Sequence, residues 1–394
     1  MIRIAGRFAT AKVYTDTLDE ETRSQIKALC DHPCAEGSAV RIMPDVHAGK
    51  GCTIGTTMTI ADRVVPNLVG VDIGCGMLTS ELGRAHIENS KLDKVIREHV
   101  PSGKHIRAER HAYVEQADLS ALRCAAKVNM SRAELSLGTL GGGNHFIEVD
   151  EDEEGNRYLV IHSGSRQLGL QIAEHYQRLA GHWLADRAVK DLIARYKSEG
   201  RHNELEQAIA NLKSGRGDAL SFLTGEAMED YLHDMAIAQR YADLNRRAMA
   251  DVILRKMKFG AREQFTTVHN YIDMERGILR KGAISAQAGE RVLIPMNMRD
   301  GSLLAVGRGN QEWNCSAPHG AGRLMSRKQA REQLSLKDFR QTMEGIFTTS
   351  VGRDTLDEAP GAYKPMEDIL RHIGDTVDVQ ACIRPKYNFK ASDE

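Results

Sequence analysis

The stretch Leu68-Val69-Gly70-Val71-Asp72-Ile73-Gly74-Cys75-Gly76 shows best how this chain should fold and where its chemistry should lie. A short apolar run leads into polar side chains set among glycines, and glycine lets a backbone approach a ligand closely or adopt dihedrals closed to other residues. We therefore expect a loop at the end of a strand. The carboxylate of Asp72 is costly to bury beside apolar neighbours unless it is paired or bound to a metal.

Four other clusters share this construction, in which a reactive or metal-competent side chain stands among small residues. They are Gly141-Gly142-Gly143-Asn144-His145-Phe146-Ile147-Glu148, Ile161-His162-Ser163-Gly164-Ser165-Arg166, Val268-His269-Asn270 and Asn314-Cys315-Ser316-Ala317-Pro318-His319-Gly320-Ala321-Gly322-Arg323. A lone histidine is more often structural than catalytic, and a lone cysteine such as Cys75 is as often a small buried residue. Because the pattern is repeated, one shared functional site is the better interpretation.

The candidate metal ligands are one carboxylate, one thiolate and three imidazoles: Asp72, Cys75, His145, His162 and His269. Mixed oxygen, sulfur and nitrogen donors favour Zn, Mn, Fe or Co over Mg or Ca. Structural zinc sites usually use close pairs such as C-x2-C, whereas these residues lie far apart and must be gathered by the fold. The set predicts two metal ions, or one ion with open positions.

In chain order, these clusters and three further segments resemble the motifs of the RtcB family of GTP-dependent RNA ligases. The further segments are Met43-Pro44-Asp45-Val46-His47-Ala48-Gly49-Lys50-Gly51, Gly138-Thr139-Leu140 and Arg280-Lys281-Gly282-Ala283. The resemblance extends from about Ala39 to Lys390 and is thinnest in the helical middle. It implies an enzyme of RNA repair or tRNA splicing that uses GTP and Mn2+. The enzyme would join an RNA end bearing a 2′,3′-cyclic phosphate or 3′-phosphate to a 5′-hydroxyl end.

By this resemblance, His319 is the nucleophile that attacks the α-phosphorus of GTP and becomes a histidine-GMP intermediate. The five candidate ligands would hold two Mn2+ ions with the Cys75 thiolate able to bridge them, and the sequence does not partition the ligands between the ions. Asp45 and His47 would orient ligands. Activity should fail at acid pH, because the nucleophile and the metal ligands must be deprotonated.

The family pattern also implies which residues contact the guanine nucleotide. Glu148 would accept two N–H donors from the guanine edge, a pair that adenine does not offer. The family's C-terminal lysine falls on Lys390, with Lys386 as its rival. The candidates are Asn144, Phe146, Ile147, Glu148, Asn270, Pro295, Met296, Asn297, Met298, Ser302, Gly320, Ala321, Gly322, Tyr363 and Lys390. Arg166 and Arg323, which lie inside glycine motifs, are the candidates for RNA contacts.

Two departures from the family pattern lie where the nucleotide should bind. The family's Gly-Ser-Met-Gly after Ile-Pro is replaced by Met296-Asn297-Met298-Arg299, in which Asn297 is a candidate replacement hydrogen-bonding group. The family's glycine after Ser-Arg is Gln167 here. We take as a hypothesis that the chain represents a paralogous branch devoted to the repair of specific damaged RNAs and not to general tRNA splicing.

Composition predicts a cytoplasmic protein without a membrane segment. The chain has 394 residues, of which 41% are hydrophobic, and its formal net charge is -1. No run reaches the roughly 18 apolar residues of a membrane span, and the N-terminus lacks the apolar core of a signal peptide. The 7 cysteines are scattered, as expected for reduced thiols. The near-neutral charge does not exclude RNA binding, because metals and a local basic cluster can hold one RNA end.

No repeat, low-complexity tract or long linker marks a domain boundary, so we expect a single catalytic domain over residues 1–394. A short helix is predicted from the N-cap Asp19 to Cys30. A mainly helical segment at about 168–257 contains a core stripe of apolar residues between Tyr231 and Ala242. Strands are expected again from Phe265 to Val306. Periodicity alone gives a mixed α/β class, and the resemblance implies central β-sheets surrounded by helices, with a helical insertion.

Two other kinds of protein compete with the ligase. A metal-dependent hydrolase or phosphatase on the same centre would need neither His319 nor guanine selectivity. A non-catalytic RNA-binding or release-factor-associated accessory protein would not need all the candidate ligands. The resemblance also leaves open an archease-type activator and a release-factor-like partner, and the sequence does not give the oligomeric state.

Overall fold

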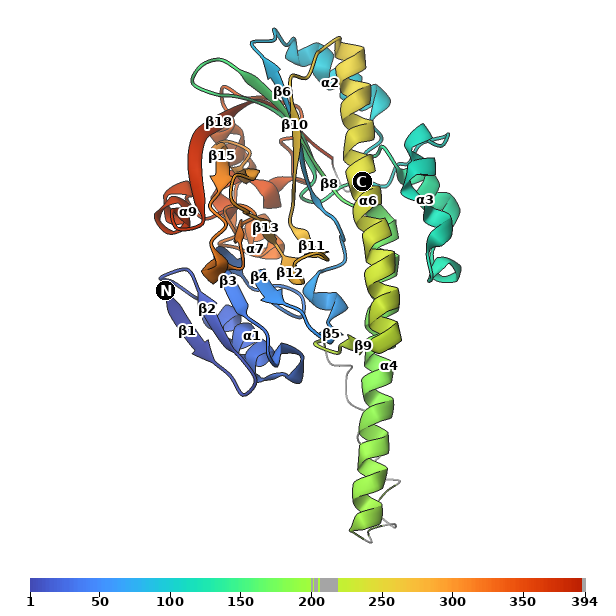
Figure 1. Cartoon of the computed structure of the whole chain (residues 1–394). Helices are drawn as coiled ribbons and strands as arrows, with labels where there is room; N and C mark the ends of the chain where they lie inside the picture. Colours follow the sequence, from blue (N-terminus) through green and yellow to red (C-terminus); the bar gives the residue numbers. More distant parts are fainter. Residues whose placement is uncertain (200, 202–204, 206–218, 392–394) are drawn as a thin grey trace.

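The computed structural model describes residues 1–199, 201, 205 and 219–391, and most of their strands gather into two large sheets (Figure 1). The first has six strands in the order β1-β2-β3-β4-β12-β11. The second has eight, in the order β10-β6-β8-β7-β18-β15-β14 with β17 beside β18. The strands are β1 Ile2–Ala5, β2 Thr10–Val13, β3 Val40–His47, β4 Ile54–Thr59, β5 Arg63–Val64, β6 Gly76–Gly83, β7 Phe146–Glu151, β8 Arg157–Ser163, β9 Leu223–Thr224, β10 Gln264–Val268, β11 Asn270–Asp273, β12 Ile278–Lys281, β13 Ala283–Ser285, β14 Arg291–Asn297, β15 Gly301–Gly307, β16 Ser316–Pro318, β17 Phe347–Thr348 and β18 Val377–Lys390.

Two long helices make up the predicted helical segment: α4 (Arg166–Ser198) and α6 (Gly225–Met257). The part of that segment at 200, 202–204 and 206–218 lies outside the described residues. The shorter helices are α1 Glu20–Asp31, α2 Asn89–His99, α3 Met130–Ser136, α7 Arg327–Gln333, α8 Leu336–Thr342 and α9 Met366–Ile373. Within the described ranges, none of the helices combines the length and apolarity needed to cross a bilayer.

The first helix begins where the sequence predicts. Asp19 Oδ1 accepts a hydrogen bond of 2.8 Å from the backbone N–H of Thr22. This satisfies one of the free donors at a helix start and contributes about 1 kcal/mol. The inner face of α1 then buries Ile26 and Leu29 completely in the core shared with the first sheet.

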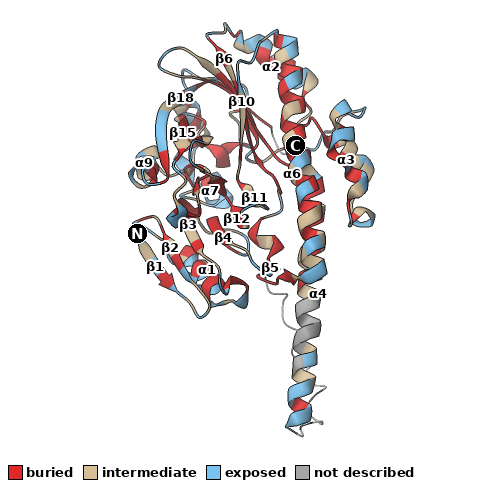
Figure 2. Cartoon of the chain, viewed as in Figure 1, coloured by how far each residue is buried: buried red, intermediate tan, exposed pale blue. Residues whose placement is uncertain are grey.

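Helix α6 runs beside the second sheet and contacts β6 and β8 (Figure 1). Its predicted apolar stripe is core, since Tyr231, Met235, Ala238 and Tyr241 are all fully buried (Figure 2). The spacing of these residues is that of one helix face. The prediction of a mixed α/β fold with central sheets covered by helices is therefore confirmed.

Strand pairing in the second sheet brings distant parts of the chain to one place. Phe146 of β7 lies opposite His162 of β8 on one side and Lys390 of β18 on the other. At the same end of the sheet, Gly76 of β6 lies opposite Val268 of β10. The segments that carry most of the chemically competent side chains thus meet at this end of the sheet, from both flanks of the helical segment.

Candidate active site

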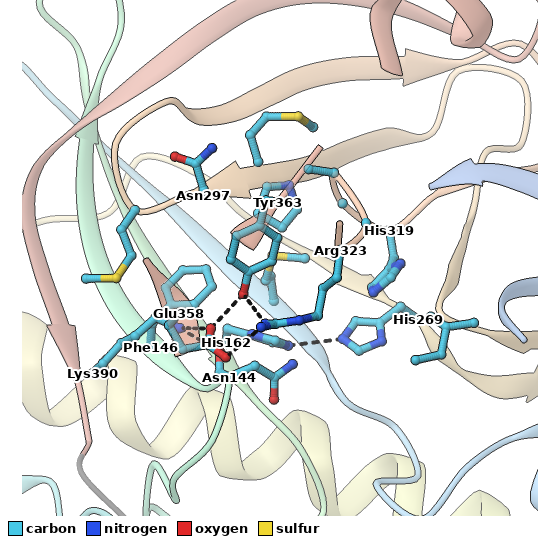
Figure 3. A pocket seen from close by; sticks show the side chains of 18 of the residues that line it. Asn144, Phe146, His162, His269, Asn297, His319, Arg323, Glu358, Tyr363 and Lys390 are labelled. Atoms are coloured by element: carbon cyan, nitrogen blue, oxygen red, sulfur yellow. Dashed lines mark hydrogen bonds and ion pairs between the residues drawn. The ribbon is translucent and has the colours of Figure 1, made fainter. Parts of the chain in front are cut away.

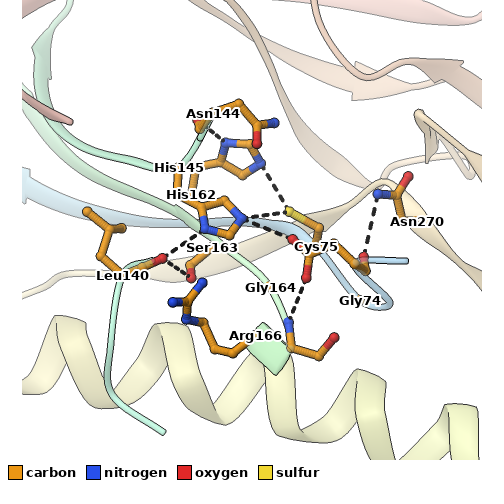
Figure 4. A network of polar contacts seen from close by, with 12 residues as sticks. Gly74, Cys75, Leu140, Asn144, His145, His162, Ser163, Gly164, Arg166 and Asn270 are labelled. Atoms are coloured by element: carbon orange, nitrogen blue, oxygen red, sulfur yellow. Dashed lines mark hydrogen bonds and ion pairs between the residues drawn. The ribbon is translucent and has the colours of Figure 1, made fainter. Parts of the chain in front are cut away.

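The five candidate metal ligands come together around the sulfur of Cys75. They form two groups that share this sulfur, one with His162 and His269 and the other with Asp72 and His145. Within each group the ligand atoms all lie within 4.8 Å of one another. Cys75 Sγ is 3.3 Å from His162 Nε2 and 3.5 Å from His145 Nε2, as Figure 4 shows. Donors bound to one tetrahedral ion lie at about this spacing, given metal–ligand bonds of roughly 2.0–2.3 Å.

Hydrogen bonds at Nδ1 turn two of the imidazoles toward the sulfur. His145 Nδ1 donates to Leu140 O at 2.8 Å, and His162 Nδ1 donates to Asn144 O at 3.1 Å. Each ring therefore keeps its Nε2 lone pair for a metal. His269 Nε2 lies 3.0 Å from His162 Nε2, so these two rings point at the same position. The donor set and its orientation fit a pair of divalent transition-metal ions that share one thiolate.

The local environment favours the metal-binding protonation states of two imidazoles and of Asp72, whereas burial and the charge of Asp72 raise the pKa of the Cys75 thiol. Burial, together with repulsion from His319, lowers the pKa of His269 to about 3. Burial also lowers the pKa of His162 well below its ordinary value. Desolvation opposes the ionisation of Asp72, but the hydrogen bond and charge of His145 hold its pKa at about 2. Neutral imidazoles and an ionised carboxylate are the forms that ligate cations.

A buried carboxylate holds the imidazole of His319. Nδ1 of His319 donates to Asp45 Oδ2 at 2.6 Å, and the backbone N–H of His319 donates to the same oxygen at 3.1 Å. Asp45 is fully buried. Lys364 Nζ donates to the carbonyls on either side of it, Pro44 O at 3.2 Å and Val46 O at 2.8 Å. Because Nδ1 is the donor, Nε2 carries the lone pair and is free to act as a nucleophile.

The backbone before His319 enters the site through two residues in the left-handed region, Asn314 with φ 53° and Cys315 with φ 45°. Such dihedrals are uncommon outside glycine and need support from their surroundings. Arg280, which is fully buried, donates through Nη2 to the carbonyls of both residues at 3.4 and 3.3 Å. Strand β16 then delivers His319 so that its ring centroid lies 4.9 Å from that of His269.

A cavity opens beside His319 (Figure 3). Figure 3 shows Lys390, Phe146 and Glu358 at one side of it and His319 and His269 at the other. Apolar walls with a few convergent polar groups are typical of a small-molecule site. Most of the predicted nucleotide-binding residues line it: Asn144, Phe146, Glu148, Pro295, Met296, Asn297, Met298, Gly320, Ala321, Gly322, Tyr363 and Lys390.

Three predicted nucleotide-binding residues do not line the cavity. Ile147 points away from it, because alternate residues of a strand face opposite sides, and it is fully buried in the core beside α6. Ser302 is fully buried in β15. Asn270 Oδ1 accepts from the backbone N–H of Gly282 at 2.9 Å and so braces the neighbouring turn.

Glu148 and Glu358 are the two buried carboxylates that line the cavity, with exposed fractions of 3% and 2%. Burial raises the pKa of Glu148 to about 7, against the hydrogen bond from Asn388 and the charge of Lys390. Burial likewise opposes ionisation of Glu358, but the charges of Lys390 and Arg327 lower its pKa to about 2. Glu358 is therefore a fixed anion, whereas Glu148 changes its protonation near neutral pH.

Glu358 anchors the donors that line its side of the cavity. It accepts from Tyr363 Oη at 2.7 Å and forms ion pairs with Lys390 Nζ at 2.6 Å, Arg327 Nη1 at 2.7 Å and Arg323 Nη1 at 3.5 Å. Lys390 is thus the C-terminal lysine at the cavity. The rival Lys386 instead pairs with Glu151 at 3.2 Å and is half exposed. Neither Glu358 nor Arg327 stands in a glycine cluster, so no local pattern pointed to them.

The structure also shows the hydrogen-bond partners of the predicted nucleotide contact Asn297 and the positions of the predicted RNA contacts Arg323 and Arg166. Asn297 lines the cavity, but its Oδ1 accepts from the backbone N–H groups of Arg299 and Asp300 at 3.0 and 2.9 Å, and its Nδ2 donates to Asp300 Oδ2 at 2.7 Å. Its amide is therefore engaged within its own loop. Arg323 lines the cavity, while Arg166 lies outside it and donates to Thr139 Oγ1 at 3.2 Å and Gly103 O at 3.1 Å.

Comparison with known proteins matches this chain to one family. The family described as tRNA-splicing ligase RtcB matches residues 25–129 and 107–391. An RNA-splicing ligase RtcB of Escherichia coli K12 is 32% identical over 384 residues, which cover 88% of each chain. A tRNA-splicing ligase RtcB of Archaeoglobus fulgidus is 27% identical over an alignment that covers 94% of this chain and 90% of the relative. The chain belongs to the RtcB family.

Proposed function

We propose that this protein is a GTP-dependent RNA ligase that joins 2′,3′-cyclic phosphate or 3′-phosphate RNA ends to 5′-hydroxyl ends. The observation that carries the proposal is the position of His319, held by Asp45 between the paired donor groups and the cavity. The names of the related RNA-splicing ligases support the same activity. The proposal treats residues 1–394 as one catalytic unit, since the donors come from segments spread from β6 to β16.

In the proposed first step, Nε2 of His319 attacks the α-phosphorus of GTP and pyrophosphate leaves. The ring gains positive charge as the nitrogen–phosphorus bond forms, and the Asp45 carboxylate at Nδ1 stabilises it. Glu148 would accept the two N–H donors of the guanine edge. Phe146 and Tyr363 would supply apolar surface for the base.

The two donor groups around Cys75 would hold two Mn2+ ions, which when bound neutralise phosphate charge and align the reacting groups. A 2′,3′-cyclic phosphate end would first be opened by water to a 3′-phosphate and a free 2′-hydroxyl. The GMP group would then pass from His319 to the RNA 3′-phosphate. Attack by the 5′-hydroxyl would join the ends and release GMP. A hydrolase on the same centre would have no use for a histidine held in this way, so the hydrolase is not favoured.

The decisive experiment is covalent labelling of the purified protein with α-labelled GTP or ATP in the presence of Mn2+. We expect acid-labile, hydroxylamine-stable label from GTP and none in the His319→Ala variant. Glu148→Gln should reduce the preference for GTP over ATP, because the amide offers only one acceptor where the carboxylate offers two. The reaction is run with and without an archease-type activator. Absence of label in both, with metal shown to be bound, would contradict the ligase.

The branch hypothesis is tested separately by ligation of tRNA exon halves against other cleaved RNAs. A protein devoted to specific damaged RNAs should join tRNA exons more slowly than its preferred substrate. Equal or faster joining of the exon pair would count against that hypothesis and leave the ligase proposal intact.

A further inference from the structure

Asn245 and Arg246 are adjacent residues of α6. Their side chains contact the segments that carry three of the candidate ligands, Cys75, His145 and His162. Both are fully buried, and Arg246 is among the largest fully buried side chains of the described chain. Neither belongs to the candidate ligands or lines the cavity. Figure 4 shows the helix passing beneath Gly74 and Ser163, close to the donors.

Arg246 ties two of these loops together. Its Nη1 donates to Gly74 O at 2.8 Å and to Ser163 O at 2.9 Å. Gly74 precedes Cys75 directly, and Ser163 follows His162 directly. One guanidinium nitrogen therefore sets the distance between the backbones that carry the shared sulfur and one of its imidazole neighbours.

Asn245 ties in the third loop. Its Oδ1 accepts from the backbone N–H groups of Gly138 at 2.7 Å and Thr139 at 3.0 Å. Its Nδ2 lies 3.1 Å from Ser163 Oγ and 3.1 Å from Gly164 O. The amide thus connects the segment that leads to His145 with the segment that follows His162.

A chain of hydrogen bonds links Asn245 to the imidazole of His145. Ser163 Oγ, which receives the bond from Asn245, donates to Leu140 O at 2.9 Å. The same carbonyl accepts from His145 Nδ1 at 2.8 Å. Groups that orient a metal-binding histidine through its second nitrogen commonly change metal affinity about 10- to 100-fold.

The charge of Arg246 is also poorly explained by a purely structural role. Its Nε and Nη2 have no hydrogen-bond partner among the described residues. Its ion pair with Asp243 is long, at 3.9 Å. The carboxylates whose charge acts on it are those of Asp243 and Asp72, and Arg247 acts with opposite sign. A buried cation with so few polar partners is costly, so its position between the segments that carry Cys75 and His162 indicates a role at the centre.

The glycine at position 74 allows the loop that carries Cys75 to lie close against α6. Gly74 has φ +73°, and a Cβ there would come within 2.9 Å of Gln239 Cα and 3.0 Å of Ala242 Cβ. A larger residue would push α6 away and lengthen the Arg246 bond.

We propose that Asn245 and Arg246 form a clamp of positioning residues that sets the spacing of the metal donors without touching the metal. This inference rests on the proposed metal-dependent function. It predicts that breaking the clamp weakens metal binding more than it weakens the fold. Because the clamp reaches both donor groups, the binding of both ions should suffer.

The test is a spectroscopic titration of the metal-free, full-length protein with Co2+, whose thiolate charge-transfer and ligand-field bands report the geometry around Cys75. Arg246→Met should lower the affinity for Co2+ about 10- to 100-fold and alter these bands. Asn245→Leu, which removes the other half of the clamp, serves if the Met variant does not fold. Ser163→Ala removes the hydroxyl that links Asn245 to Leu140 but keeps both Arg246 bonds, and it should have a smaller effect of the same sign.

Two variants on the same helix are the controls. Arg247→Met removes a half-exposed cation that pairs with Asp243 at 2.7 Å and should leave Co2+ binding unchanged. Asp234→Ala removes a fully buried acceptor whose partners are the backbone N–H groups of Arg123 and Cys124 and the hydroxyl of Tyr176. It should lower the melting temperature with Co2+ affinity preserved, which separates loss of stability from loss of positioning.

Wild-type affinity and bands in a folded Arg246→Met or Asn245→Leu variant would overturn the clamp and leave the proposed ligase untouched. A loss of affinity in Asp234→Ala equal to that in the clamp variants would also overturn it, because destabilisation alone would then explain both. Wild-type protein that binds no Co2+ would instead remove the metal centre itself, and the clamp with it.

Discussion

Nδ1 of His319 donates to Asp45 Oδ2 at 2.6 Å, and Asp45 is fully buried, so the nucleophilic candidate has one tautomer built into the fold. The sequence predicts only a general orienting role for Asp45. The structure shows that the ring it orients is His319 and that Asp45 belongs to neither donor group. The residue that orients the candidate nucleophile is therefore distinct from the residues that would bind the metal ions.

Asp45→Asn should therefore slow guanylylation of His319 about 10³- to 10⁴-fold, since an amide that donates to Nδ1 would place the proton on Nε2. Single-turnover labelling with GTP at saturating Mn2+ measures the rate. Metal content should stay at the wild-type value. A rate within tenfold of wild type would show that the tautomer is set by another group.

Acid should destabilise the metal-free protein through His47. Burial lowers the pKa of His47 to about 4 in the folded protein, whereas an unfolded histidine titrates near 6.5. The unfolded state thus binds more protons between these values, so the contribution of His47 to stability is complete above about pH 6.5 and is lost as the pH falls toward 4.

His47→Gln should reduce the number of protons taken up on unfolding near pH 5 by nearly one, and so flatten the pH dependence of the unfolding free energy. Urea unfolding of metal-free protein at several pH values measures this slope. His99→Gln is a matched control, because His99 ends α2 and belongs neither to the donor groups nor to the lining of the cavity. An unchanged slope in the His47 variant would mean that its neutral form is not what the fold requires.

The buried pair of Glu358 and Lys390 should be strongly coupled. Glu358→Gln leaves Lys390 without its carboxylate at 2.6 Å and should cost about 3–5 kcal/mol of unfolding free energy. Adding Lys390→Met should recover part of that loss, because the unpaired cation is then removed. Denaturant unfolding of both single variants and the double variant gives the coupling. Additive effects within about 0.5 kcal/mol would mean that the pair does not act as a unit.

Much of the site could be predicted because its residues stand in glycine-rich clusters. Asp72, Cys75 and His145 each follow or precede an apolar strand, and such local patterns are visible in a chain read alone. Helix α1 and the core stripe of α6 were predictable for the same reason, since capping and periodicity act over a few residues.

What could not be predicted depends on long-range packing. Glu358 comes from a short turn with no motif, and its role arises only when β18 brings Lys390 beside it. Asn245 and Arg246 look like part of a solvated helix face in the sequence, yet both are fully buried. Asn297 lines the cavity as its predicted nucleotide contact requires, but the hydrogen bond between its amide and Asp300 depends on the fold of the loop.

The partition of the donors also needed the structure, and it makes a sharp prediction about metal content. His269 belongs only to the group with His162, Asp72 belongs only to the group with His145, and Cys75 belongs to both. His269→Ala and Asp72→Ala should therefore each lose one ion of two, whereas Cys75→Ala should weaken both. Elemental analysis after dialysis against limiting Mn2+ measures the stoichiometry. His99→Ala, at the end of α2 and outside both groups, is the control. Loss of both ions from either the His269 or the Asp72 variant would show that the two groups bind cooperatively and not as separate positions around one sulfur.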